Sequence, residues 1–93
     1  MTAGERMAAL ARSFPTLSGA DGVEPFDPEA LDLWACGPVP GNSAKHAARF
    51  VLSVWDAGAD WQCGPFNLAR AAGTWDGRHL TALRAWLADP WLA

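Results

Sequence analysis

The chain has 93 residues, of which 51% are hydrophobic and 18% are charged, and its formal net charge is −3 at pH 7. This length predicts one small domain, and the apolar fraction excludes a disordered polar chain and a fibre. The acidic balance argues against direct binding to nucleic acids or anionic membranes, which usually needs a basic surface. No apolar run of about 18 residues is present to span a membrane, and charges at Glu5 and Arg6 argue against a secretory signal. We therefore expect a cytoplasmic protein.

The chain is rich in large rings, with six Trp and four Phe but no Tyr. Each Trp can bury roughly 200 Å², so ten rings supply much of the core that a short domain otherwise lacks. The many alanines favour helices. The composition therefore predicts an all-α bundle of four to five short helices with a Trp/Phe-rich core. We interpret residues 1–93 as a single domain, with an N-terminal helix and loop (1–26) that could be mobile and a helical core (27–93).

The first predicted helix spans Thr2–Phe14. Thr2 and Glu5 have the spacing of a capping box, in which each side chain accepts the other residue's amide N–H. Pro15 ends the helix, and the Gly and Pro content of residues 16–26 predicts a loop. One face of this helix carries the apolar residues Ala3, Met7, Leu10 and Phe14.

A short second helix is predicted over Pro28–Ala35. Asp27 can cap it, and proline suits its first position. Its buried side is expected to consist of Leu31, Trp34 and Ala35.

The central helix is predicted over Ala44–Trp55, with Asn42 or Ser43 as its cap. It is apolar on most sides, which is typical of a helix at the centre of a fold. Residues Phe50–Trp55 are also rich in strand-forming types, so a buried strand is the alternative there. The longer pattern, which begins well before Phe50, favours the helix.

Two helices are predicted in the C-terminal third of the chain. Two helical turns are expected over Phe66–Ala72, and a longer helix capped by Asp76 is expected to end near Ala88 and to pack across the central helix. The buried face of this last helix is predicted to comprise His79, Leu80, Leu83, Trp86 and Leu87.

Thiols and imidazoles are the groups most able to support catalysis or metal binding. Cys63, His79 and Asp76 could form a nucleophile–base–acid set, although nothing in the sequence places them together. The wide spacing of Cys36, His46, Cys63 and His79 is unlike that of structural zinc sites, whose ligands come in close pairs. We expect no metal and no cofactor. A Cys36–Cys63 bridge is an alternative to the preferred interpretation of two buried thiols.

Five acids and no base lie between residues 21 and 32, and four of them are candidate contact residues: Asp21, Glu24, Glu29 and Asp32. Such a patch could dock on a basic groove or imitate a nucleic-acid backbone. The preferred interpretation is a solvated loop together with acids that favour the helix start.

The tryptophans divide into two sets. Trp34, Trp55 and Trp86 fall on predicted buried faces and are expected in the core. Trp61 lies in a turn and Trp91 follows the helix-ending Pro90, so these two, together with Leu92, are the candidate contact surface. The alternative for Trp91 is that it folds back and plugs the bundle.

Several segments together resemble short uncharacterised bacterial proteins of accessory or mobile genes. The similarity lies in residues 46–55 (HAARFVLSVW), residues 61–68 (WQCGPFNL), Trp75-Asp76 with His79, and Ala85-Trp86 with residues 89–91. It covers residues 43–92. It implies a bacterial cytoplasmic setting and supplies no activity, cofactor or catalytic residue.

The favoured function is that of a small non-enzymatic binding protein. It would modulate a larger macromolecular partner, expected to be a protein, as a regulator or as an inhibitor encoded by a phage or mobile element. One alternative is a small enzyme or metal protein using Cys63, His79 and Asp76. Another is a structural subunit that self-associates, as a homodimer for instance, through Trp61 and Trp91.

Overall fold

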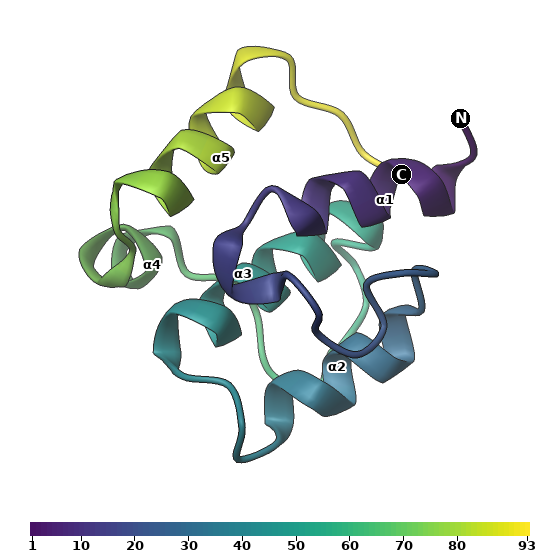
Figure 1. Cartoon of the computed structure of the whole chain (residues 1–93), viewed down its shortest axis with the longest axis horizontal. Helices are drawn as coiled ribbons and strands as arrows, with labels where there is room; N and C mark the ends of the chain where they lie inside the picture. Colours follow the sequence, from purple (N-terminus) through teal and green to yellow (C-terminus); the bar gives the residue numbers. More distant parts are fainter.

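The computed structural model describes residues 1–93 and consists of five α-helices without a strand. Helix α3 lies in the middle and contacts α1, α2 and α4, whereas α5 stands at the edge of the bundle (Figure 1). The all-α prediction is confirmed, as is the preference for helix over strand at Phe50–Trp55. The elements are α1 (Ala3–Arg12), a 3-10 turn η1 (Pro15–Leu17), α2 (Pro28–Cys36), α3 (Asn42–Trp55), α4 (Leu68–Thr74) and α5 (Gly77–Ala88).

Local side-chain caps start most of the helices. The predicted capping box forms, since the Glu5 amide donates to Thr2 Oγ1 at 3.1 Å and the Thr2 amide donates to Glu5 Oε1 at 3.3 Å. Asp27 and Asp76 also cap as predicted, each accepting the amide N–H of the residue three positions on. These contacts satisfy amides that have no partner within the first helical turn.

Some helix boundaries differ from the predictions. Helix α1 ends at Arg12, two residues before the predicted end, and η1 begins at Pro15 and extends into the predicted loop. The cap of α3 is Gly41, without a side-chain hydrogen bond, so the prediction of Asn42 or Ser43 as the cap is wrong.

Helix α4 starts at Leu68 rather than at Phe66. The reason is Asn67, whose side-chain oxygen accepts the Arg70 amide at 3.0 Å and so caps the helix one residue before Leu68. Phe66 therefore lies outside the helix, where its ring packs on Phe50 and Trp75.

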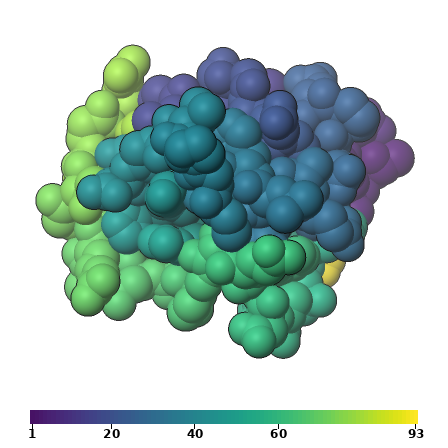
Figure 2. Space-filling view, turned by 90° about the horizontal axis from the view of Figure 1, so that it is seen from below, coloured from purple at the N-terminus to yellow at the C-terminus, as the bar shows by residue number.

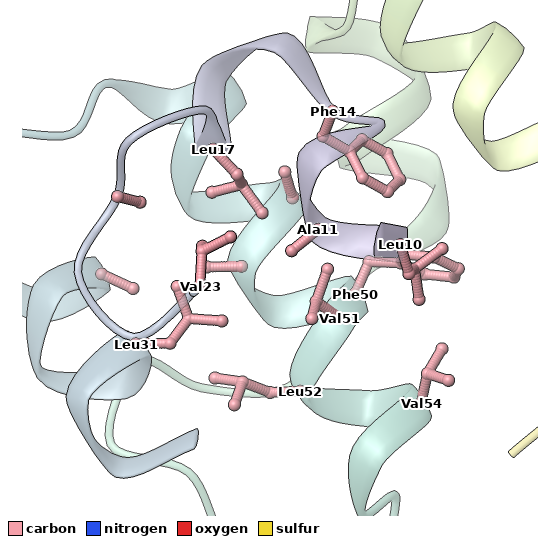
Figure 3. Close-up of a cluster of buried hydrophobic side chains, with 14 of the residues drawn as sticks. Leu10, Ala11, Phe14, Leu17, Val23, Leu31, Phe50, Val51, Leu52 and Val54 are labelled. Atoms are coloured by element: carbon pink, nitrogen blue, oxygen red, sulfur yellow. The ribbon is translucent and has the colours of Figure 1, made fainter. Parts of the chain in front are cut away.

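The hydrophobic core forms where α1, the following loop and α2 cover α3 (Figure 3). The N-terminal segment contributes directly, because Met7, Phe14 and Leu17 are completely buried. Leu31 reaches the core from α2, and Val51 lies on the facing side of α3. Burial of such side chains stabilises a fold by about 1.5–3 kcal/mol each.

A chain of aromatic rings connects α5 and the segment before it to this core. Phe14 lies 5.3 Å from Trp75 between ring centroids, and Phe50 meets Trp86 edge to face at 5.4 Å. Trp75, which the sequence analysis did not assign to the core, is the most buried indole, and its Nε1–H donates to the Ser43 carbonyl at 3.0 Å. The three tryptophans predicted in the core are half-buried at its margin: Trp34, Trp55 and Trp86.

The buried face of α5 differs from the predicted one at its end. His79 and Leu83 are buried as expected, and Ala82 joins them, but Leu87 is 54% exposed. The prediction for Leu87 is wrong because Leu87 lies one turn beyond Leu83, near the end of a helix that stands at the edge of the bundle. Helix α5 thus reaches α3 through the Trp86–Phe50 pair rather than along its whole length.

Candidate functional site

The buried carboxylate of Asp32 fixes the loop that contains Cys63. Asp32 is 5% exposed, and its two oxygens accept the amide N–H groups of Gln62 at 3.0 Å and Cys63 at 2.9 Å. On the other side of the loop, Arg49 Nε–H donates to the Cys63 carbonyl at 2.6 Å. The peptide groups flanking Cys63 are therefore held between an acid on α2 and a base on α3. The expectation that Asp32 belongs to an exposed acidic patch is wrong, since these amides bind it inside the protein.

Both thiols are free, with Cys36 exposed and Cys63 buried, so the interpretation of two buried thiols is wrong for Cys36. Burial, followed by the neighbouring Asp32 carboxylate, raises the pKa of the Cys63 thiol to about 12. A thiol with so high a pKa is a weak nucleophile at neutral pH.

His79 occupies a separate polar cluster, where it bridges the η1 turn and the start of α5. Its Nε2 lies 2.8 Å from Thr16 Oγ1 and its Nδ1 lies 2.8 Å from Asp76 Oδ1. The hydrogen bonds from His79 hold the pKa of Asp76 at about 2. The order of hydroxyl, imidazole and carboxylate is that of a nucleophile with its base, yet Thr16 and His79 line none of the main cavities. Through these hydrogen bonds, His79 links η1 to the start of α5.

The structure therefore brings His79 together with Asp76 but not with Cys63, whose hydrogen-bond partners are Asp32, Arg49 and Gly64. No group of three or more His, Cys, Asp or Glu side chains is arranged to hold a metal ion. His46, the other imidazole, is buried in α3 with its Nδ1 unpaired. Burial, followed by the charges of Arg49 and Arg70, lowers the pKa of His46.

The remaining acidic candidates are on the surface. Glu24 forms an ion pair with Arg12 across the loop, and Asp21 and Glu29 are exposed. Glu24 also lines the largest cavity, of about 510 Å³, beside the start of α1. An exposed pair of this kind contributes little to stability.

The tail folds back over the bundle, as the alternative for Trp91 proposed. The Arg6 guanidinium lies 3.9 Å from the centroid of the Trp91 ring, a cation–π distance. Trp86 Nε1–H donates to the Trp91 carbonyl at 3.1 Å, and the Ala93 amide donates to the Val54 carbonyl at 3.1 Å. Figure 1 shows the C-terminal segment returning from the end of α5 to α1.

An apolar groove lies between α1 and α5 beneath this tail. Its volume is about 290 Å³. Leu87 and Leu92 directly follow two of the groove residues and are 54% and 68% exposed. The groove is lined by Arg6, Ala9, Leu10, Ser13, Ala82, Ala85, Trp86 and Trp91.

Trp61 lies elsewhere, on the loop between α3 and α4. It is half-buried, and its Nε1–H donates to the Asp56 carbonyl at 3.3 Å. The predicted contact residues therefore separate into two places, with Trp91 and Leu92 beside the groove and Trp61 on the loop fixed by Asp32.

The sequence did not reveal the contacts of Thr16 and Arg49, or the buried position of Asp32. A signal existed for Asp32, because it lies between Leu31 and Ala35, both of which were placed on the buried side of α2. An acid within an apolar arc needs buried hydrogen-bond donors.

No protein-family model matches this sequence, and no curated protein and no solved structure matches it either. No helix of the structure combines the length and the apolar character needed to cross a bilayer. A function can therefore be inferred only from the surface and the polar contacts of the structure.

Proposed function

We propose that the protein is a small binding protein that modulates a larger protein partner in the cytoplasm, and that it binds this partner through the α1–α5 groove. The observation that carries the proposal is the groove itself, which places two indoles and several alanines beside two exposed leucines, Leu87 near the end of α5 and Leu92 in the tail. Exposed apolar surface of this kind is typical of contact sites.

The two indoles are held in place, which favours binding. Trp86 is fixed by its hydrogen bond to the tail, and Trp91 is fixed by the Arg6 guanidinium. An indole that is already ordered loses little conformational entropy when a partner covers it. Tryptophan and arginine are also the residue types enriched among those that dominate binding energy.

The other polar groups support a binding role rather than a catalytic one. Cys63 and His79 each serve an internal contact, in two separate clusters, and the raised pKa of the Cys63 thiol does not suit a nucleophile. These contacts do not favour the alternative of an enzyme built from Cys63, His79 and Asp76.

The proposal is tested by capture from a lysate of the organism that encodes the protein, with quantitative identification of the bound proteins. Leu92→Asp and Leu87→Asp place a charge beside the groove, and Leu33→Asp is the matched control, because Leu33 on α2 is similarly exposed at 60%. We expect one partner to be recovered equally by wild type and Leu33→Asp and to be lost from the other two variants. Equal recovery by all four proteins contradicts the proposal.

Light scattering on the same four proteins separates the self-association alternative. A monomer under all conditions agrees with a foreign partner. A dimer that Leu92→Asp disrupts and Leu33→Asp retains would instead identify a second copy of the chain as the occupant, which contradicts the proposal.

A further inference from the structure

A second cleft lies on a different part of the molecule, between the C-terminal half of α3 and the loop that follows it. Its volume is about 270 Å³, slightly below the usual range of roughly 300–1,000 Å³ for drug-sized ligands, and so it suits a smaller molecule. Figure 2 shows the loop and the start of α4 (green) at the border of the surface formed by α2 and α3 (blue to teal). The principal side chains lining the cleft are Arg49, Ser53, Asp56, Trp61 and Phe66.

Arg49 supplies a positive charge at this cleft. Its side chain is half-buried, and its Nε–H is used by the Cys63 carbonyl, but it forms no ion pair with any acid of the chain. The Nη groups of Arg49 make no hydrogen bond within the protein. A guanidinium in this position presents a fork of donors that matches the two oxygens of a carboxylate.

Two aromatic rings supply the apolar side of the cleft. The hydrogen bond from Trp61 to the Asp56 carbonyl fixes the indole, and the Phe66 ring packs edge to face on Phe50 with centroids 5.2 Å apart. The loop between these rings is itself held by Asp32, and Gly64 turns it with a φ of +89°. The cleft is therefore formed before any ligand arrives, which lowers the entropic cost of binding.

Asp56 limits the charge that the cleft accepts. It follows α3 two helical turns beyond Arg49, and its Oδ1 accepts the Gly58 amide at 3.1 Å. Its negative charge, together with the negative end of the α3 dipole, disfavours a second acid at that end of the cleft.

We propose that this cleft binds a monocarboxylate carried on an apolar or aromatic body, with the carboxylate on Arg49 and the body between Trp61 and Phe66. Two sources supply this chemistry, a free small acid and the C-terminal residue of a peptide. This site is separate from the α1–α5 groove, and the inference stands or falls independently of the proposed function.

The test is a titration followed by the NMR signals of the Trp61 indole N–H and the Arg49 Nε–H. The probes are 3-phenylpropionate, its neutral amide, and a short peptide ending in phenylalanine with either a free or an amidated C-terminus. We expect the free acids to shift both signals at about 1 mM, and the two amides to leave them unchanged. If the free-acid peptide binds more tightly than 3-phenylpropionate, a peptide C-terminus is the source, and otherwise a small acid is.

Three variants complete the experiment. Arg49→Lys keeps the charge and a donor for Cys63 but loses the fork, and Trp61→Ala removes one ring, so each is expected to weaken binding about tenfold or more. Arg70→Gln removes an exposed charge on α4, outside the cleft, and should bind like wild type. Equal shifts from acid and amide, binding unchanged in Arg49→Lys or in Trp61→Ala, or no shift at all would each overturn the proposal. Should Arg49→Lys fail to fold, Trp61→Ala and the acid–amide comparison still decide the outcome.

Discussion

Asp32 on α2 accepts the amide N–H of Cys63, which lies 31 residues further along the chain, at a distance of 2.9 Å. Together with the bond from the neighbouring Gln62 amide, this contact attaches the α3–α4 loop to a helix that precedes both. A buried carboxylate is stable in such a place when backbone donors replace its water. The loop in turn shapes the cleft at Arg49 and Trp61.

Asp32→Ala should destabilise the protein strongly, because it leaves two amides without an acceptor. The expected loss is about 3 kcal/mol in the free energy of unfolding measured with urea. Glu29→Ala, one turn earlier on the same helix and exposed, should change it by no more than about 0.5 kcal/mol. Similar losses in the two variants would show that Asp32 does not hold the loop.

The two cysteines should react with thiol reagents at very different rates. At pH 8, Cys36 should react quickly because it is exposed, whereas Cys63 should stay protected by burial and by a pKa raised to about 12. A colorimetric thiol count should find one fast group in the native protein and two after denaturation. Cys36→Ser should remove the fast group, and a fast group that persists in Cys36→Ser would contradict the buried position of Cys63.

Stability should fall as the pH drops below the ordinary histidine value of 6.5 because of His46. The unfolded chain takes up a proton on this side chain near pH 6.5, but the folded protein resists it, since burial and two arginines lower the pKa. The contribution of neutral His46 to the free energy of unfolding is therefore complete above pH 6.5 and is lost as the pH falls below it. The free energy of unfolding, measured with urea across this pH range, should fall more steeply with decreasing pH in wild type than in His46→Gln. Equal dependence on pH in the two proteins would contradict the lowered pKa of His46.

The orientation of α5 can be checked with two truncations. Leu83→Ala removes a buried side chain and should cost about 2–5 kcal/mol. Arg78→Ala removes an exposed side chain whose pair with Asp76 spans 3.6 Å, so its effect should be within about 0.5 kcal/mol. Thermal melts of the two variants that coincide would contradict the buried position of Leu83.

The helices were largely predictable because their signals are local. The capping residues Thr2, Asp27 and Asp76 each act on an amide three positions away, and periodic apolar residues placed α3 at the centre. The exposure of Leu87 depends instead on where the neighbouring helices end, which no local pattern reports.

The polar contacts were harder to predict because they join distant parts of the chain. Thr16 meets His79 across 63 residues, and Arg49 meets the Cys63 carbonyl across 14. Cys63 was a candidate partner of His79 by residue type alone, and the fold places the hydroxyl of Thr16 beside the imidazole instead. The separation of Trp61 from Trp91 likewise follows from how the tail returns to α1.

The most direct measurement of the proposed binding surface is photo-cross-linking in the native cells, with a benzoylphenylalanine introduced at position 87, 92 or 33. These three positions carry leucines of similar exposure, but 87 and 92 flank the α1–α5 groove and 33 lies on α2. We predict that positions 87 and 92 yield an adduct with the same partner protein and that position 33 does not. Adducts that are equal at all three positions, or absent from 87 and 92, would contradict the account.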